Sequence, residues 1–143
     1  MANQEEIASY EIHLYAGKDV PKRYINLIRS RWMRSYKHDN DFMKLADPEG
    51  YYFSYSGYIE SILNRPRTDV RFAVLSDDDD VVLGFSVTEA NILHYVHVPK
   101  AYRKNGIAKM LLPDKIDWFS HLTKIGIKLW ATKVPHAKFN PFV

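Results

Sequence analysis

The segment from Leu93 to Leu112 limits the fold most strongly. It reads as an apolar strand, a bend at Pro99, a basic loop and the start of a helix. Gly106 in the loop can adopt backbone conformations closed to other residues and lets the main chain approach a ligand closely. The free amides of the loop and of the first helical turn converge on one point, where a helix dipole adds about half a positive charge. The chain is therefore expected to pack a strand against a helix with an anion-binding loop between them.

The periodicity of apolar residues divides the rest of the chain into a short series of elements. We predict strands over Tyr10–Tyr15, Val70–Leu75, Val81–Thr88, Ile92–Val98 and Ile125–Thr132, and helices over residues 20–36, Gly57–Leu63 and Ile107–Leu122. The order is therefore β-α-α-β-β-β-α-β. The strands around the acidic turn Asp77–Asp80 form a hairpin, and the β-α-β unit Ile92–Thr132 requires a parallel pair. This order predicts an α/β fold with a mixed antiparallel and parallel sheet flanked by helices.

Length and composition exclude several classes of protein. The 143 residues fit one domain over 1–143, because a single core usually takes about 100–200 residues. The chain has no cysteine, which rules out disulfides, thiolate–zinc sites and cysteine nucleophiles and fits a cytoplasmic location. No apolar run approaches the roughly 20 residues that span a bilayer, and the polar N-terminus is unlike a signal peptide. The net charge of +3 suits an anionic small ligand as well as nucleic acid, so it leaves the ligand open.

At the basic loop the sequence resembles the GNAT N-acetyltransferase superfamily, whose coenzyme loop reads Arg/Gln-x-x-Gly-x-Gly/Ala. The matching residues here are Arg103, Lys104, Asn105, Gly106, Ile107 and Ala108. The lead-in Val96–Tyr102 is similar to the family's hydrophobic strand followed by Pro-x-x-Tyr. The hairpin from Phe72 to Phe85 and the order of elements from Tyr10 to about Thr132 also agree with the family. The resemblance therefore extends over most of the chain.

The resemblance implies an N-acetyltransferase that uses acetyl-CoA. The amides of Lys104–Ala108 would bind the pyrophosphate of the coenzyme, and Arg103, Lys104 and Lys109 would surround it with positive charge. The backbone of the preceding strand, at Val96 and Val98, would pair with the pantetheine arm where the central strands diverge. An amide there could stabilise the oxyanion formed when the acyl carbonyl is attacked. The acceptor would be the amine of a small molecule or a peptide.

Catalytic candidates lie on the strand before the loop, at His94, Tyr95 and His97. Alternation in a strand places Tyr95 and His97 on one face and His94 on the other. A histidine with a pKa near ~6.5 could accept a proton from an ammonium substrate. The alternative is that each histidine packs in the sheet with its nitrogens hydrogen-bonded.

The short segment after the last predicted strand leaves the activity open. Family members usually continue with a helix that often carries a general-acid tyrosine, and here that helix is expected to be missing or reduced. The tail Phe139–Phe142 is expected to be extended, since it contains proline and asparagine. Two functions therefore remain: an active N-acetyltransferase, or a binding or structural protein that has the fold without turnover.

The basic and aromatic run Arg29–Lys37 is a candidate surface for nucleic acid. At helical spacing, however, Ile28 and Trp32 face the core while Arg29, Arg34 and Lys37 point outward. We interpret the run as a solvated helix face, so nucleic acid is not expected as a partner.

Two further patterns suggest chemistry at first sight. The four carboxylates of Asp77–Asp80 lack the spacing of a calcium loop, so we interpret them as a solvated turn and predict no metal site. Ser120 and His121 are neighbours in the predicted helix Ile107–Leu122, where their side chains would point about 100° apart. They are therefore not expected to form a nucleophile–base pair.

The predicted last strand, Ile125–Thr132, would have one unpaired edge. Such an edge promotes association unless it is covered or charged. We therefore expect a homodimer formed through this strand. The alternative is that the tail Pro135–Val143 covers the edge, although its prolines lack an N–H to donate.

Overall fold

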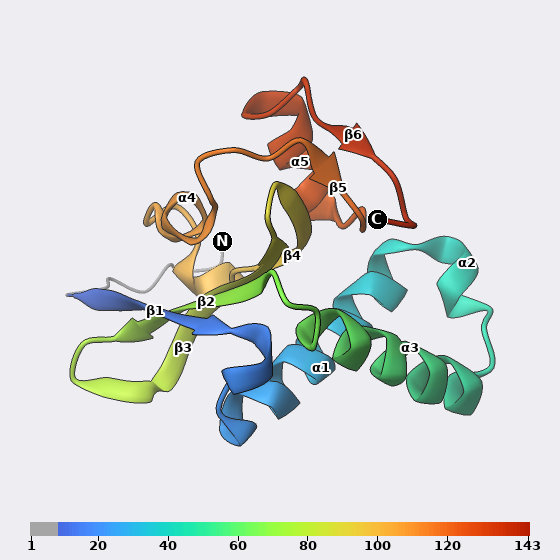
Figure 1. Ribbon diagram of the computed structural model, residues 1–143, viewed down its shortest axis with the longest axis horizontal. Helices are drawn as coiled ribbons and strands as arrows, with labels where there is room; N and C mark the ends of the chain where they lie inside the picture. Colours follow the sequence, from blue (N-terminus) through green and yellow to red (C-terminus); the bar gives the residue numbers. More distant parts are fainter. Residues whose placement is uncertain (1–8) are drawn as a thin grey trace.

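The computed structural model describes residues 9–143, and Figure 1 shows their arrangement. Within this range six strands form one sheet in the order β1-β2-β3-β4-β5-β6. Neighbouring strands are antiparallel from β1 to β4, whereas β4–β5 and β5–β6 are parallel. The predicted mixed α/β fold is therefore confirmed. The strands are β1 (Tyr10–Ala16), β2 (Thr68–Leu75), β3 (Asp78–Glu89), β4 (Ile92–His97), β5 (Trp118–Phe119) and β6 (Lys138–Phe139).

One face of the antiparallel strands packs against helices α1 and α3. On α1 the buried residues recur every four positions, at Tyr24, Ile28 and Trp32, as an amphipathic helix requires. They meet Phe72 and Phe85 from β2 and β3 in the largest apolar cluster. The position of α1 against the sheet is thus fixed by its buried stripe. The helices are α1 (Lys22–Asp39), α2 (Asp41–Lys44), α3 (Pro48–Leu63), α4 (Ile107–Leu111) and α5 (Lys124–Thr132), with 3-10 turns at Gly17–Asp19 and Lys100–Tyr102.

Helix α3 begins well before the predicted start at Gly57. Asp47 caps it by accepting a hydrogen bond from the amide of Gly50 at 2.9 Å, and Pro48 occupies the first turn. Both are standard helix-start signals. The sequence around Asp47 therefore marks a helix start that lies outside the predicted helices.

The predicted helix Ile107–Leu122 is wrong beyond its first turns, because α4 ends at Leu111. Leu112 is already extended, with φ −91° and ψ 145°, as expected for a residue that precedes a proline. Pro113 has no N–H and cannot continue the helix. The chain then runs to the short strand β5, and α4 packs on the face of the sheet opposite α1, against Leu83 and Val98.

The predicted strand Ile125–Thr132 is also wrong, because these residues form helix α5. The hydroxyl of Thr123 caps the helix by accepting a hydrogen bond from the amide of Gly126 at 3.0 Å. Leu129 is buried, Trp130 is half-buried and Ile127 is half-exposed, so burial does not alternate along the segment. With no strand at this position, the expected dimer interface loses its basis.

The C-terminal tail completes the sheet instead. Strand β6 pairs in parallel with β5, through hydrogen bonds from Lys138 N to Asp117 O and from Asn140 N to Phe119 O, both 2.9 Å. The expected extended tail is confirmed at Lys138–Phe139. The helix expected to be missing or reduced is present as α5, which lies between two strands of two residues each.

Candidate functional site

The loop predicted to bind the coenzyme has an unusual backbone. Lys104 and Gly106 both adopt positive φ angles, 67° and 75°, and Gly106 is the N-cap of α4. Left-handed residues of this kind turn successive amides toward a common concavity. The side-chain amide of Asn105 supports the turn by donating to the carbonyl of Tyr102 at 3.0 Å. Because α4 is only five residues long, its dipole contributes less than the predicted long helix would have done.

A cavity of about 420 Å³, here called the loop cavity, lies beside this loop. Among the described residues that line it, five are cationic and none is acidic. Lys128 and Lys133 come from α5 and its C-terminal end, opposite the loop. The sequence reading missed them because it placed their segment in a strand. The lining residues are Val98, Tyr102, Arg103, Lys104, Gly106, Ile107, Ala108, Lys109, Lys128 and Lys133.

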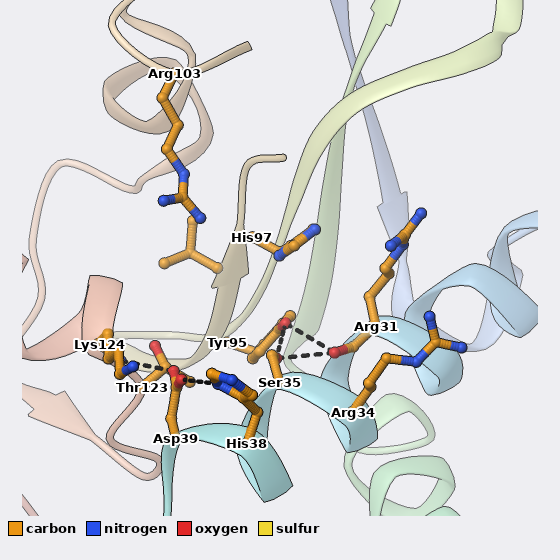
Figure 2. Close-up of a pocket in the computed structure, with 11 residues that line it drawn as sticks. Arg31, Arg34, Ser35, His38, Asp39, Tyr95, His97, Arg103, Thr123 and Lys124 are labelled. Carbon is orange, nitrogen blue, oxygen red and sulfur yellow. Dashed lines mark hydrogen bonds and ion pairs between the residues drawn. The ribbon is translucent and has the colours of Figure 1, made fainter. Parts of the chain in front are cut away.

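A second cavity of about 380 Å³, here called the strand cavity, lies on the α1 side of β4 (Figure 2). It shares Arg103 with the loop cavity. Residues from α1, β4 and the start of α5 surround it. They are Arg31, Arg34, Ser35, His38, Asp39, Tyr95, Val96, His97, Arg103, Thr123 and Lys124.

Strand β4 connects the two cavities. It pairs with β5 only at Ile92 and Leu93, and Ser120 N donates to Leu93 O at 3.2 Å where the pairing stops. Beyond that point Val96 lines the strand cavity and Val98 lines the loop cavity. Arg103 bridges them, since its Nε donates to the carbonyl of Val98 at 2.9 Å. The pairing of β4 with β5 thus stops before Val96, which is one of the positions where the resemblance places the pantetheine arm.

Of the three candidates, Tyr95 and His97 line the strand cavity, and His97 is the one with a ring nitrogen that lacks a hydrogen-bond partner among the described residues. This nitrogen is the buried Nε2. The ring stacks on Tyr95, with centroids 6.3 Å apart and planes 12° apart. Burial, together with the nearby charges of Arg31 and Arg103, lowers the pKa of His97 to about 4. His97 is therefore neutral at pH 7 and able to accept a proton, although it is a weaker base than an ordinary histidine.

Tyr95 is held firmly by α1. Its ring stacks on Trp32 with centroids 5.1 Å apart, and its hydroxyl contacts Ser35 Oγ and donates to Arg31 O at 3.2 Å. Burial raises the pKa of Tyr95 well above its usual value. Tyr95 and His97 share a face of the strand, as expected, but the hydroxyl of Tyr95 is occupied.

His94 lies away from both cavities. Its Nε2 is 2.9 Å from Glu89 Oε1 and its Nδ1 is 2.5 Å from Ser120 Oγ, so both nitrogens are satisfied. Burial lowers its pKa. The predicted alternation fails here because a bulge between Val87 and Thr88 shifts the register. His94 thus fits the alternative role of a packed histidine.

The hydrogen-bonded chain continues from His94 through Ser120 to His121. Ser120 Oγ and His121 Nδ1 are 2.7 Å apart, because these residues do not lie on the predicted helix and their side chains are not held about 100° apart. Ser120 is 1% exposed and lines neither cavity. Its hydroxyl is therefore closed to a substrate, and the chain is structural.

Helix α1 supplies side chains to the strand cavity that the sequence analysis did not identify as site residues. Its run Arg29–Lys37 does present Ile28 and Trp32 to the core, as predicted. Arg31 and Arg34, however, line the strand cavity. Their spacing of three residues, which puts them on one helix face, was the signal that could have identified them.

The acidic turn forms a surface contact. Arg23 pairs with Asp79 and Asp80 at 3.0 Å each, and all three side chains are largely exposed. Exposed pairs of this kind contribute little to stability. The carboxylates of Asp78–Asp80 lie close together but belong to neither cavity.

The sheet is mixed, and pairing between β4 and its parallel neighbour β5 stops next to a glycine loop and a cationic cavity. This arrangement is that of the GNAT acetyltransferase fold. No protein-family model and no curated protein matches the sequence. Solved structures do match. A proposed acetyl transfer enzyme from Pyrococcus furiosus aligns over 91% of this chain and 80% of its own, with a TM-score of 0.53 and 17% identity. A ribosomal-protein-alanine N-acetyltransferase from Brucella melitensis aligns over 87% and 89%, with a TM-score of 0.51 and 17% identity.

A third similar structure is a proposed acetyltransferase from Bacillus subtilis, with a TM-score of 0.50 and 13% identity over 91% of this chain and 80% of its own. At these identities the likeness establishes the fold. The chain has the GNAT fold. Within residues 9–143, no helix has both the length and the apolar character of a membrane span.

Proposed function

We propose that the protein is an N-acyltransferase that transfers an acetyl group from acetyl-CoA to a primary amine. The observation that carries this proposal is the pair of cavities joined along β4 at Arg103. One offers a cationic site for a phosphorylated donor, and the other offers space for an acceptor. The fold supports the same proposal, since the similar structures include an N-acetyltransferase.

The loop cavity fits the phosphates of coenzyme A. Lys104, Lys109, Lys128 and Lys133 would neutralise them, and Arg103 would add a guanidinium whose planar donors match a phosphate. The amides around Gly106 would approach the pyrophosphate closely, because no β-carbon stands there. The absence of acidic side chains among the described lining residues removes any repulsion of an anion.

The backbone of Val96–Val98 would hold the pantetheine arm, because β5 leaves this part of β4 unpaired. When bound, acetyl-CoA supplies an acetyl group activated as a thioester. The acyl end would then lie in the strand cavity, next to His97. In the transfer a C–N bond forms, the C–S bond breaks, and the amine loses one proton.

His97 is the proposed acceptor of that proton. Among the described residues its Nε2 has no hydrogen-bond partner, and its low pKa keeps the ring neutral at physiological pH. The cations around it also disfavour the ammonium form of the acceptor, so they lower the pKa of the acceptor and favour its free amine. The leaving thiolate can regain a proton from water or from His97.

One observation favours the second candidate, a protein with the same fold that binds coenzyme A without turnover. The hydroxyls of Tyr95 and Ser35, which line the strand cavity, contact each other. Neither hydroxyl is therefore free to protonate the leaving thiolate.

Calorimetry and a thiol-release assay test the proposal. We expect acetyl-CoA and CoA to bind, and we expect the double variant Lys128→Ala/Lys133→Ala to bind about tenfold more weakly, because two phosphate contacts are lost. The control is Lys18→Ala/Lys22→Ala, which removes the same charge from exposed positions outside both cavities. No binding at millimolar CoA would overturn the proposal. Binding without thiol release from any amine would support the second candidate.

A further inference from the structure

We infer that the acceptor is a small amine that itself carries an anionic group, a carboxylate or a phosphate. This inference rests on the proposed function, since it names the substrate class of the same site. The observation that carries it is the positive charge of the strand cavity. A pocket that binds a polyamine or an aminoglycoside, which are cations, is expected to be negatively charged.

The strand cavity is strongly cationic. Among its described lining residues, Arg31, Arg34, Arg103 and Lys124 carry permanent positive charge, and Asp39 is the only carboxylate. A cationic acceptor would be repelled from such a pocket, whereas an anionic group would be attracted. Charge complementarity therefore selects the anionic amine.

Asp39 is already engaged. Its Oδ2 accepts a hydrogen bond from the backbone amide of Lys124 at 2.8 Å, and its Oδ1 lies 3.3 Å from His38 Nδ1. The Asp39 side chain is 12% exposed. It therefore joins α1 to the start of α5, and both of its oxygens already have a partner.

Arg31 and Arg34 are free to bind an anion. The chain pairs its guanidinium groups with carboxylates at Arg23, Arg29 and Arg65. In contrast, within residues 9–143 neither Arg31 nor Arg34 forms an ion pair, and the guanidinium of Arg34 makes only a 3.4 Å contact with Ser30 Oγ. Two unpaired guanidinium groups at one cavity are what recognition of a carboxylate or phosphate requires.

The two arginines are also placed together. Their spacing of three residues puts them on one face of α1. Figure 2 shows both side chains extending from α1, with that of Arg31 beside the ring of His97. An anion held by this pair would thus leave the amine of the same molecule near His97 and the open part of β4.

The size of the cavity limits the acceptor. A volume of about 380 Å³ suits a small molecule or the reacting end of a larger one. Since the acyl end of the donor shares this space, the anion and the amine must belong to one compact molecule. An α-amino acid and an amino-sugar phosphate both meet this description, and they share the chemistry that the arginine pair recognises.

A direct binding experiment tests the arginine pair independently of turnover. The protein is first saturated with CoA, and inorganic phosphate is then titrated while the Nε–Hε signals of the arginines are followed by NMR. We expect the signals of Arg31 and Arg34 to shift and that of the exposed Arg67 to remain unchanged. No shift at Arg31 or Arg34 up to tens of millimolar phosphate would overturn the inference. If CoA fails to bind, the proposed function fails, and the phosphate titration still decides on the anion site.

A kinetic experiment separates the two anion sources. Thiol release is measured for matched acceptors that share their amine: alanine against alaninamide, and glucosamine 6-phosphate against glucosamine, with spermidine as the polycation. We expect the anionic member of at least one pair to have a kcat/KM about tenfold or more above its neutral counterpart, and the pair that responds identifies carboxylate or phosphate. Arg31→Gln/Arg34→Gln should abolish this preference with CoA affinity unchanged, whereas Arg67→Gln should keep it. A preference for spermidine, or equal rates within both pairs, would contradict the inference.

Discussion

The two halves of the sheet are built differently. From β1 to β4 the strands are six to twelve residues long and share a continuous apolar cluster with α1 and α3. From β5 to β6 each strand has two residues. A smaller apolar cluster that includes Phe119 and Leu129 holds this segment together, with hydrogen bonds such as that from Trp130 Nε1 to Ala137 O at 2.7 Å. The first half supplies a rigid β4 and α1, and the second half opens away from them. Both cavities lie where the two halves meet, so their shape depends on the difference.

The largest expected effect is in the core of the antiparallel half. Trp32 is fully buried, stacks on Tyr95 and meets His121 edge-on with ring centroids 5.1 Å apart. Trp32→Ala should lower the free energy of unfolding by about 3–5 kcal/mol, because it leaves a cavity beside the rings of Tyr95 and His121. Urea denaturation followed by far-UV circular dichroism measures this loss. A loss below about 1 kcal/mol would mean that the first half is not the rigid one.

The pH dependence of stability tests how the core holds its histidines. Burial lowers the pKa of His121 to about 3, whereas the unfolded chain binds the proton near pH ~6.5. Between these values the unfolded state binds more protons, so the free energy of unfolding falls as the pH falls from about 6.5 toward about 3. We expect a decrease of about 2 kcal/mol from this residue between pH 7 and pH 4.5.

His121→Gln provides the comparison for that measurement. The variant should show a flatter dependence of unfolding free energy on pH, without abolishing it, because the pKa values of His94 and His97 are lowered as well. Thermal denaturation of both proteins between pH 4.5 and 8 gives the slopes. Equal slopes would show that His121 is solvated rather than enclosed by the aromatic rings around it.

A smaller effect is expected in the parallel half. Trp130→Ala removes the hydrogen bond to Ala137 O and the packing against Phe119, and should cost about 2 kcal/mol. Because the apolar cluster of that half is separate from the one shared by α1 and α3, we expect the change to be local. Hydrogen exchange should accelerate in residues 133–143 and stay unchanged in β2 and β3. Faster exchange throughout β2 and β3 would show that the two halves unfold as one unit.

The smallest effects come from two glycines that have open space around them. A β-carbon on either Gly106 or Gly57 would meet nothing within 4 Å, but only Gly106 has a positive φ. Gly106→Ala should therefore cost about 1 kcal/mol and weaken CoA binding, whereas Gly57→Ala, inside α3, should stabilise by about 0.5–1 kcal/mol. Melting temperatures of the two variants give the signs. A gain in stability for Gly106→Ala would exclude a strained coenzyme loop.

The sequence predicted the antiparallel half more accurately than the parallel one. The strands β2 to β4 and the buried stripe of α1 could be predicted because their apolar residues recur with the period of a strand or of a helix. In the parallel half, the predicted helix Ile107–Leu122 ran past Pro113, which ends α4. The predicted strand was wrong because apolar and other residues alternate over Ile127–Thr132, a segment too short to distinguish the period of a strand from that of a helix. The cap at Thr123, with Gly126 three residues later, was the local signal for a helix.

The candidate site also has a part that the sequence predicted and a part that it did not. The sequence by itself determined the loop Arg103–Ala108 and the strand before it, because glycine, proline and clustered cations act over a few neighbouring residues. Only the tertiary structure decided that, among the described residues, Nε2 of His97 has no partner while both nitrogens of His94 do, since a bulge in β3–β4 pairing sets which ring meets which partner. It also decided that Arg31, Arg34, Lys128 and Lys133 reach the cavities. Charges far apart in the chain gather only when helices pack against the sheet, and no local pattern records that packing.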